Sequence, residues 1–235
     1  MKLNQFIAAA IVAAAAMPAM AATVFSDNFS GAHPNIATQT FNSGATTGFS
    51  YWGTTNNSIL NPIGGNMGAG FFSVVNRASD IHSSFVSTLD ADNNVGGQYA
   101  VYNGFSNLAG TAYSVTLNNL VVGDTYSFSA ALLALTTSAF PQISAIMFRA
   151  NGVDLIPDTV VTPQPVNVGG WETVTRSFVA VAGPNVLRIV NLGSASNAGN
   201  DFGIDNIAVV NAIPLPASAL MGTSMMAVAT LRRRR

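Results

Sequence analysis

The chain has 235 residues, no cysteine, 49% hydrophobic residues, 8% charged residues and a formal net charge of -1. This hydrophobicity argues against an intrinsically disordered chain, and the lack of cysteine excludes a disulfide framework, zinc-thiolate sites and thiol catalysis. Charged residues usually make up about 25% of a soluble domain, so Asn, Ser, Thr and Gly must cover this surface. Such a composition is common in exported proteins that face polysaccharide.

The N-terminal residues 1–21 are predicted to be a secretory signal peptide. Lys2 precedes an apolar run over residues 6–16, and the triplet A-M-A closes the segment. A positive start, a short apolar core and an A-x-A site are the parts of such a peptide. The apolar run is shorter than the ~20 residues that a permanent membrane span needs. We expect export and cleavage after Ala21 or Ala22, and the alternative is a buried N-terminal helix.

Residues 22–211 are predicted to form a single β-rich domain. About 190 residues suffice for one domain with its own core, and no stretch keeps an apolar period of 3.6 residues. Short runs rich in β-branched and aromatic residues alternate with Gly, Asn, Asp and Pro, which is typical of strands and turns. The expected strands cover residues 23–29, 70–75, 98–102, 113–120, 125–135, 143–149, 171–181, 186–192 and 203–210.

Eight or nine strands without helices predict a β-sandwich. The strand over residues 171–181 is less regular than the others, since Val174 and Phe178 share a face with Arg176. We therefore expect a mixed strand there, with a bulge.

The charge balance changes when both ends of the chain are set aside. Ten acidic residues stand against four arginines between the ends, which leaves this part at about -6. Nucleic acid is excluded as an expected partner, because neutralising phosphates needs a basic face.

Residues suited to catalysis are scarce. Glu172 is the sole glutamate, and His33 and His82 lie in polar segments without ligand-like spacing. A glycosidase needs two facing carboxylates whose pKa values differ, and the strained Gly-x-Ser-x-Gly turn of serine hydrolases is missing from the sequence. We expect no enzymatic activity and name no catalytic residue.

The C-terminal residues 212–235 are predicted to be a membrane-sorting tail. A Pro-containing motif leads into thirteen mostly apolar residues, 219–231, and the chain then ends in four arginines. A polybasic end beside an apolar segment stays on the cytoplasmic side and halts translocation. Thirteen helical residues reach only about 20 Å, so we expect a transient anchor. The residues of this signal are Pro214, Leu215, Pro216, Ala217, Ser218, Arg232, Arg233, Arg234 and Arg235.

This tail closely resembles the PEP-CTERM sorting tail. The pentapeptide I-P-L-P-A at 213–217 is similar to its VPLPA variant, and it stands behind a signal peptide and before an arginine cluster. The resemblance implies a Gram-negative bacterium that makes exopolysaccharide and an exosortase-type membrane enzyme that acts on the tail. It also implies export through the inner membrane, transient tail-anchoring there, and final placement at the cell surface or outside the cell. An ordinary tail anchor is the alternative.

The domain resembles galactose-binding-like jelly rolls, which include carbohydrate-binding modules. The motifs are T-Y-S-F-S at 125–129, Trp171 with Phe178, L-R-I at 187–189 and the closing strand N-D-F-G-I-D-N-I at 200–207. The resemblance implies an all-β fold, a single jelly-roll β-sandwich.

The same resemblance implies a structural calcium ion. In such jelly rolls the ion joins an early acidic residue to an Asp of the last strand, and Asp27 and Asp205 occupy matching places with Asp201 nearby. A second loop, Asp90 to Gly97, begins like a D-x-D-N calcium loop but lacks the closing Glu. The alternative for all of these residues is turn formation through hydrogen bonds to their own backbone.

Four aromatic residues are the candidate sugar-binding groups. Aromatic rings stack on sugars while their polar tips tolerate water, and the candidates are Tyr51, Trp52, Tyr99 and Tyr102. The alternative is that these rings pack in the core.

Two functional classes therefore remain open. In the first, an exported surface or matrix protein binds exopolysaccharide through its sandwich. In the second, a structural surface protein self-associates or binds other proteins without a glycan site. An exposed aromatic strip would favour the first class, and buried rings with an uncovered apolar sheet edge would favour the second.

Overall fold

The computed structural model describes seven segments of the chain, namely residues 21–29, 50–51, 66–104, 110–136, 145–156, 170–192 and 200–212. Ala22–Ala212 forms one compact unit. The predicted sorting motif and all but the last residue of the predicted signal peptide lie outside the described residues. Within the described part, no helix combines the length and hydropathy that a membrane span requires.

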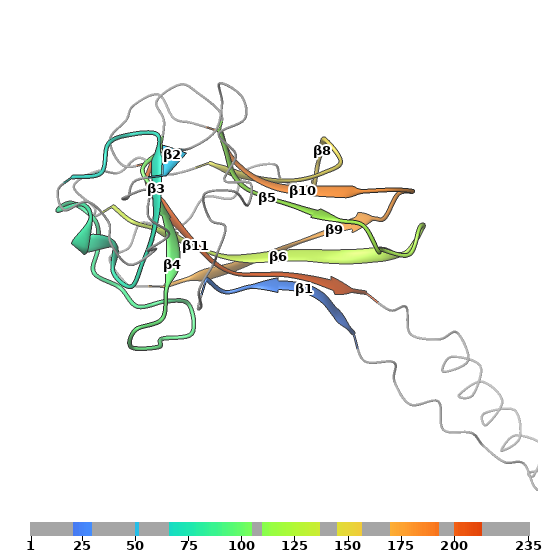
Figure 1. Cartoon of the computed structure of the whole chain (residues 1–235), viewed down its shortest axis with the longest axis horizontal. Coiled ribbons are helices and arrows are strands. Elements are labelled where there is room, and N and C mark those ends of the chain that lie inside the picture. The colour runs from blue at the N-terminus through green and yellow to red at the C-terminus, as the bar shows by residue number, and fades with distance from the viewer. Residues whose placement is uncertain are drawn as a thin grey trace, which may run out of the picture. The chain divides into compact units, whose positions relative to one another are not determined.

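In the described segments, eleven strands form two sheets, which pack face to face (Figure 1). The larger sheet has the order β2-β3-β4-β11-β6-β9, with β1 paired to β11, and the smaller sheet has the order β5-β10-β7-β8. All pairings are antiparallel except β2 with β3. The strands are β1 (Thr23–Asp27), β2 (Ser50–Tyr51), β3 (Phe71–Val75), β4 (Tyr99–Tyr102), β5 (Gly110–Leu117), β6 (Thr125–Ala134), β7 (Ile146–Ala150), β8 (Val153–Asp154), β9 (Glu172–Val179), β10 (Asn185–Asn191) and β11 (Phe202–Asn211).

The predicted fold class is confirmed, since the described residues form an all-β sandwich. From β4 onward the longer strands alternate between the two sheets, which is the connectivity of a jelly roll. Each of the nine expected strands is present, with shifts of a few residues at its ends. The two-residue strands β2 and β8 and one 3-10 turn, Ala78–Asp80, were not predicted because such short elements leave no periodic pattern.

A tight turn sets the register between β7 and β8. Asn151 and Gly152 join β7 to β8, and both have positive φ angles, 53° and 83°. Two consecutive residues of positive φ are what a type I′ hairpin needs, and Asn-Gly is its preferred sequence. The turn therefore follows directly from the two residue types.

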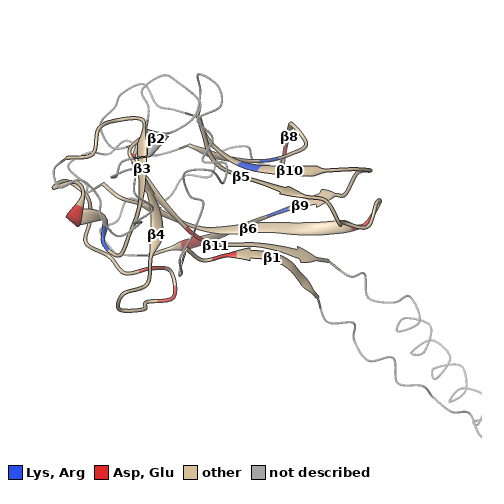
Figure 2. Ribbon diagram, in the orientation of Figure 1, with Lys and Arg blue, Asp and Glu red and all other residues tan. Residues whose placement is uncertain are grey.

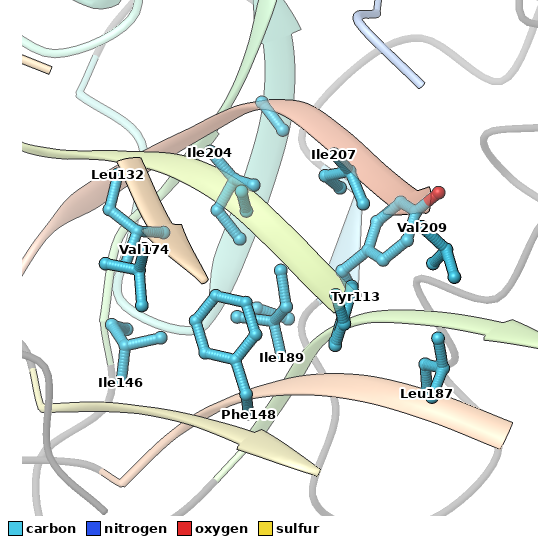
Figure 3. Packing of buried hydrophobic residues seen from close by; sticks show 14 of the residues in the cluster. Tyr113, Leu132, Ile146, Phe148, Val174, Leu187, Ile189, Ile204, Ile207 and Val209 are labelled. Atoms are coloured by element: carbon cyan, nitrogen blue, oxygen red, sulfur yellow. The ribbon is translucent and has the colours of Figure 1, made fainter. Parts of the chain in front are cut away.

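The inner core fills the space between the two sheets (Figure 3). The larger sheet contributes Leu132 and Ile204, and the smaller sheet contributes Phe148 and Ile189. The rings of Phe128 and Phe148 meet edge to face across the sandwich, with centroids 5.0 Å apart. Such contacts add about 0.5–1.5 kcal/mol to the free energy gained by burial.

An outer cluster covers part of the larger sheet on its opposite face. Val101 projects from β4 and Leu133 from β6, the two strands on either side of β11, and Ile81 and Phe85 of the segment between β3 and β4 pack on them. The two backbones also meet there, because Val86 N–H donates to the Leu135 carbonyl over 2.9 Å. Part of the larger sheet, around β4 and the end of β6, is thus buried on both faces.

The bulge expected in residues 171–181 is absent from β9. This strand pairs with β6 in continuous register from Glu172 to Val179. Arg176 shares a face with Val174 and Phe178 as the sequence indicated, yet it stays half-exposed. β9 is the edge strand of the described sheet, so the long arginine side chain can lie along the apolar face while its charged end reaches water.

Candidate functional site

Tyr102 is a core residue and not a sugar-binding platform. Its side chain is fully buried, and its hydroxyl donates a 2.8 Å hydrogen bond to the Ala112 carbonyl. Its ring stacks on Phe202 at 4.9 Å and on Phe72 at 5.8 Å, both within the inner core. No ring face is left for a ligand, so the prediction for this residue is wrong, and the alternative of core packing applies.

Tyr99 is buried in the outer cluster, on the opposite face of the sheet. Its hydroxyl accepts from the Ala78 N–H over 3.0 Å and donates to the Thr88 carbonyl over 3.3 Å. Its ring meets Trp171 edge to face at 5.1 Å. Tyr99 thus fastens the covering segment to the sheet and is not accessible to a sugar.

The other two aromatic candidates receive no structural account. Tyr51 belongs to the backbone of β2, and its side chain is not described. Trp52 lies outside the described residues. No aromatic residue is among the exposed large hydrophobic residues of the described segments.

Asp27 points into the space between the sheets. One carboxylate oxygen accepts from the Phe29 N–H over 3.1 Å, and the other accepts from the Tyr113 hydroxyl of β5 over 2.9 Å. Tyr113 belongs to the inner core. The Asp27 carboxylate therefore links the first strand of the larger sheet to the smaller sheet.

Asp205 points to the other side of the same sheet. Within β11, Phe202 and Ile204 face the inner core, while Gly203 faces Trp171 and Leu133 of the outer cluster. Alternation along a strand places Asp205 on the side of Gly203. Its two oxygens accept from the N–H groups of Ala91 at 2.9 Å and Asn206 at 2.8 Å.

The two carboxylates that we paired as calcium ligands thus lie on opposite faces of the larger sheet. A calcium ion needs its oxygen ligands 2.3–2.6 Å away, and one ion cannot reach both groups through a sheet. Among the described residues, no three His, Cys, Asp or Glu side chains are grouped to hold a metal ion. The arrangement of Asp27 and Asp205 does not fit the implied ion.

The loop that begins with Asp90 folds onto β11. This contact brings together the Asp90–Gly97 loop and Asp205, which the sequence presents as two separate calcium candidates. Asp90 accepts from the backbone N–H and the side-chain amide of Asn94. Asp92 accepts from the Asn206 amide over 2.8 Å, and Asp205 accepts from Ala91. A Cβ atom at position 97 would collide with the Asp90 carboxylate, so a glycine at this position leaves room for that carboxylate. We refer to this set of contacts as the Asp90–Asp205 clasp.

Asp201 connects the start of β11 to the segment that follows β4. It is buried, and its carboxylate accepts from the Gly104 N–H over 3.0 Å. Burial raises the pKa of Asp201 to about 7, and burial likewise raises the pKa of Asp205 to about 7. The backbone hydrogen bonds act in the opposite direction in both cases without cancelling the effect.

A row of polar side chains crosses the outward face of the smaller sheet. Arg188 of β10 lies opposite Ser114 of β5 on one side and Arg149 of β7 on the other, and Arg149 lies opposite Asp154 of β8. These residues alternate with Leu187, Ile189 and Phe148, which face the inner core. Arg188 is exposed, and the other three members are half-buried. We call these four residues the arginine row.

The two arginines of this row are direct cross-strand neighbours. Like charges in that position destabilise a sheet, and Arg149 gains some compensation from an ion pair with Asp154. Charged residues are sparse over the sandwich as a whole (Figure 2). The guanidinium group presents a planar fork of donors that matches carboxylates in a bidentate manner. The guanidinium groups of the row can therefore bind an anion.

Sequence analysis missed the arginine row. The sequence contained one signal for this row, the scarcity of basic residues. Only four arginines lie between the ends of the chain, and Arg149 and Arg188 are two of them. They are 39 positions apart in the numbering, and only strand pairing shows that they are adjacent.

Comparison with known proteins yields structural likenesses only. No protein-family model matches the chain, and no curated protein does. The EclA C-terminal domain, a sugar-binding protein, is 25% identical with a TM-score of 0.38, and the match covers 44% of this chain and 69% of that one.

Two further likenesses are to carbohydrate-binding modules. The CBM22-1 xylan-binding domain of Paenibacillus barcinonensis Xyn10C is 11% identical with a TM-score of 0.39, over 83% of this chain and 97% of that domain. A family 35 carbohydrate-binding module from Clostridium thermocellum is 16% identical with a TM-score of 0.35, over 59% of this chain and 90% of that module. The chain spans 23% of a matched xylanase and 21% of a matched insecticidal toxin. With TM-scores this low, none of these likenesses assigns a ligand or an activity to this chain.

Proposed function

We propose that this chain is an exported, non-catalytic surface protein whose sandwich binds an acidic exopolysaccharide through the arginine row. The observation that carries the proposal is the direct pairing of the exposed Arg188 with the half-buried Arg149 on the outward face of the smaller sheet. The fully buried Tyr99 and Tyr102 favour recognition by charge and hydrogen bonds over recognition by stacked rings.

The placement of the arginine row supports a polymer as the ligand. The row runs across the strands from Ser114 to Asp154, and cross-strand neighbours lie about 5 Å apart. An acidic polysaccharide carries carboxylates at regular intervals and can bind guanidinium groups along such a row. The net charge of about -6 between the ends of the chain makes nonspecific attraction to polyanions weak, so the contact would depend on these two arginines.

The sorting part of the proposal rests on the sequence of the two ends. A signal peptide directs export, and the tail from Pro214 to Arg235 acts as substrate for an exosortase-type membrane enzyme. Membrane fractionation of cells that express the whole chain tests this point. Replacing Arg232–Arg235 with serine should move the protein from the membrane fraction to the soluble exported fraction, because the stop-transfer charge is lost. An unchanged distribution would count against the anchor.

Co-sedimentation tests the glycan site. Residues 22–212 would be mixed with alginate, a polyuronate, with neutral dextran and with exopolysaccharide from the producing cell. We expect binding to alginate that weakens with salt and that falls at least several-fold in Arg188→Gln and Arg149→Gln. Arg176→Gln on β9 is the matched control, since it removes the same charge elsewhere. Equal loss in all three variants, or no binding to any acidic polymer, would overturn the proposal.

The second functional class, a structural protein that self-associates, has two observations in its favour, the burial of Tyr99 and Tyr102 and an edge strand of the described larger sheet. β9 is the edge of the described larger sheet, and it is eight residues long. An open edge can pair with another chain. Sedimentation velocity over a range of protein concentrations distinguishes the two classes, because self-association without glycan binding would support the second.

A further inference from the structure

Exposed valines gather at one end of the sandwich. Of the eight large hydrophobic residues that are exposed in the described segments, six lie in or beside the turns at this end. Val122 is the example with the clearest position, since it is 61% exposed at the tip of the turn between β5 and β6. We call the six residues the valine rim, and they are Val24, Val121, Val122, Val153, Val179 and Val181.

Hydrogen bonds show that the turns of the valine rim adjoin one another. The Gly123 N–H donates to the Ala180 carbonyl over 2.9 Å, and the Ala180 N–H donates to the Asp124 carbonyl over 2.9 Å. The buried Asn185 extends the connection, because its side-chain oxygen accepts from both the Val181 N–H and the Asn151 amide. Three turns therefore form a single surface.

This surface is almost free of charge. The turn segments 121–124, 151–153 and 180–185, together with the strand ends 22–24 and 211–212, contain one ionisable side chain, that of Asp124. Asp124 accepts a 3.4 Å hydrogen bond from the Asn211 amide. Clustered apolar side chains without charges are unusual on a freely solvated surface and mark a contact with an apolar partner.

Both ends of the compact unit leave from the same surface. The Asn211 N–H donates to the Ala22 carbonyl over 3.0 Å, and the Ala212 N–H donates to the Thr125 carbonyl over 3.0 Å. Figure 1 shows the start of β1 and the end of β11 beside the turn that precedes β6. Ala212, the last described residue, therefore lies beside the valine rim.

The connection between the rim and the apolar residues 219–231 is short. Ala219 follows Ala212 by seven positions, and an extended chain covers at most about 3.6 Å per position, or about 25 Å here. A segment inserted in a bilayer would therefore hold the valine rim close to the lipid surface. Tethering at such a distance raises the effective concentration of a weak contact.

We propose that the valine rim docks on the lipid bilayer while the tail anchors the chain. The proposal rests on the membrane anchoring of the tail described under Proposed function. In the docked state the rim valines enter the interface between headgroups and acyl chains, where apolar side chains gain most from leaving water. The scarcity of charge at this end lowers the desolvation cost that would oppose the contact.

Single cysteines offer a direct test, since the natural chain contains none. Residues 22–235 would be labelled with an environment-sensitive fluorophore at Val122→Cys and reconstituted in vesicles of phosphatidylethanolamine and phosphatidylglycerol. Val95→Cys is the matched control, because Val95 is an exposed valine in the Asp90–Gly97 loop, away from the rim. A third label at Ala227→Cys reports on the apolar segment itself.

Docking predicts that the Val122 label shifts to shorter wavelength on vesicles and loses several-fold of its accessibility to aqueous iodide, while the Val95 label stays unchanged. If the Ala227 label enters lipid and the Val122 label stays accessible, the docking proposal is wrong while the anchor holds. If the Ala227 label and the Val122 label both stay in water, the proposed membrane anchor is wrong as well as the docking proposal. Protection of Val122 that rises with protein concentration without vesicles would overturn the proposal in favour of contact with a second copy of the chain.

Discussion

The Asp205 carboxylate accepts a hydrogen bond of 2.9 Å from the backbone N–H of Ala91, a residue 114 positions earlier in the chain. This bond is the centre of the Asp90–Asp205 clasp, which fastens the loop after Asp90 to β11. β11 in turn pairs with three other strands, β1, β4 and β6. The role of Asp205 in the structure is therefore to connect these segments through hydrogen bonds.

Replacing Asp205 tests this role. Asp205→Ala leaves the N–H groups of Ala91 and Asn206 without their acceptor, so the free energy of unfolding should fall by about 1–3 kcal/mol. Chemical denaturation in calcium and again in chelator measures the loss, which should be equal in both. A calcium-dependent stabilisation that is present in the natural chain and missing in the variant would instead show that Asp205 is a metal ligand. Val95→Ala serves as the exposed control, with little expected effect.

Stability should fall as the pH rises from about 4 to above 7. Burial raises the pKa of both Asp201 and Asp205 to about 7 from a usual value of 3.8, so the folded state holds protons that the unfolded state has released. Their contribution to stability is fully present below pH 4 and is lost as the pH passes through 7.

Thermal unfolding at pH 5 and pH 8 measures this effect. A lower melting temperature at pH 8, by on the order of 5 °C, is expected for a domain of this size. The double variant Asp201→Asn/Asp205→Asn should lose most of the difference, because neither position can then ionise. A melting temperature that rises between pH 5 and pH 8 in the natural chain would contradict the prediction.

Tyr102→Phe should affect stability and leave glycan binding unchanged. The variant keeps the ring stacked on Phe202 but removes the donor to the buried Ala112 carbonyl. An unsatisfied buried acceptor costs about 1–3 kcal/mol, and denaturant titration measures it. Alginate co-sedimentation at a temperature where both proteins are folded provides the second readout, and a specific loss of binding there would restore Tyr102 as a site residue.

Asn185→Ala should be among the more destabilising single changes. Its side chain is fully buried, and it donates to the carbonyls of Val181 and Gly183 and accepts from the Val181 N–H and the Asn151 amide. Removing it leaves several partners unsatisfied, so we expect a loss of about 2–3 kcal/mol. Asn94→Ala, in a partly exposed loop, is the comparison variant and should lose less; an equal loss in both would refute the special role of Asn185.

The sequence was sufficient for the class of fold. The spacing of apolar residues and turn residues located all nine longer strands, because alternation and turn chemistry are local properties of the chain. The sequence was not sufficient to predict the strand geometry at Arg176, where we expected a bulge. The sequence showed the shared face, but only the sheet order shows that β9 is an edge at which a charged side chain reaches solvent.

The candidate sites depended far more on the tertiary structure. Tyr99 and Tyr102 are of a residue type that often binds sugars, but the strands and loops that pack over them bury both side chains. Asp27 and Asp205 stand at matching places in the first and last strands, yet the pleat directs their carboxylates to opposite faces. A one-residue change in the register of β1 on β11 would reverse that result, and no tight turn joins the first and last strands to set that register.

The sequence alone determined the composition of the surface, the export and sorting signals that we predict at the two ends, and the positions of the longer strands, because each depends on residues close together in the chain. Only the tertiary structure decided which distant residues are neighbours. Strand pairing placed Arg149 beside Arg188, and the packing of three turns brought Val122 and Val181 to the end from which the chain leaves the domain. These contacts arise from pairing across many positions, which local sequence does not encode.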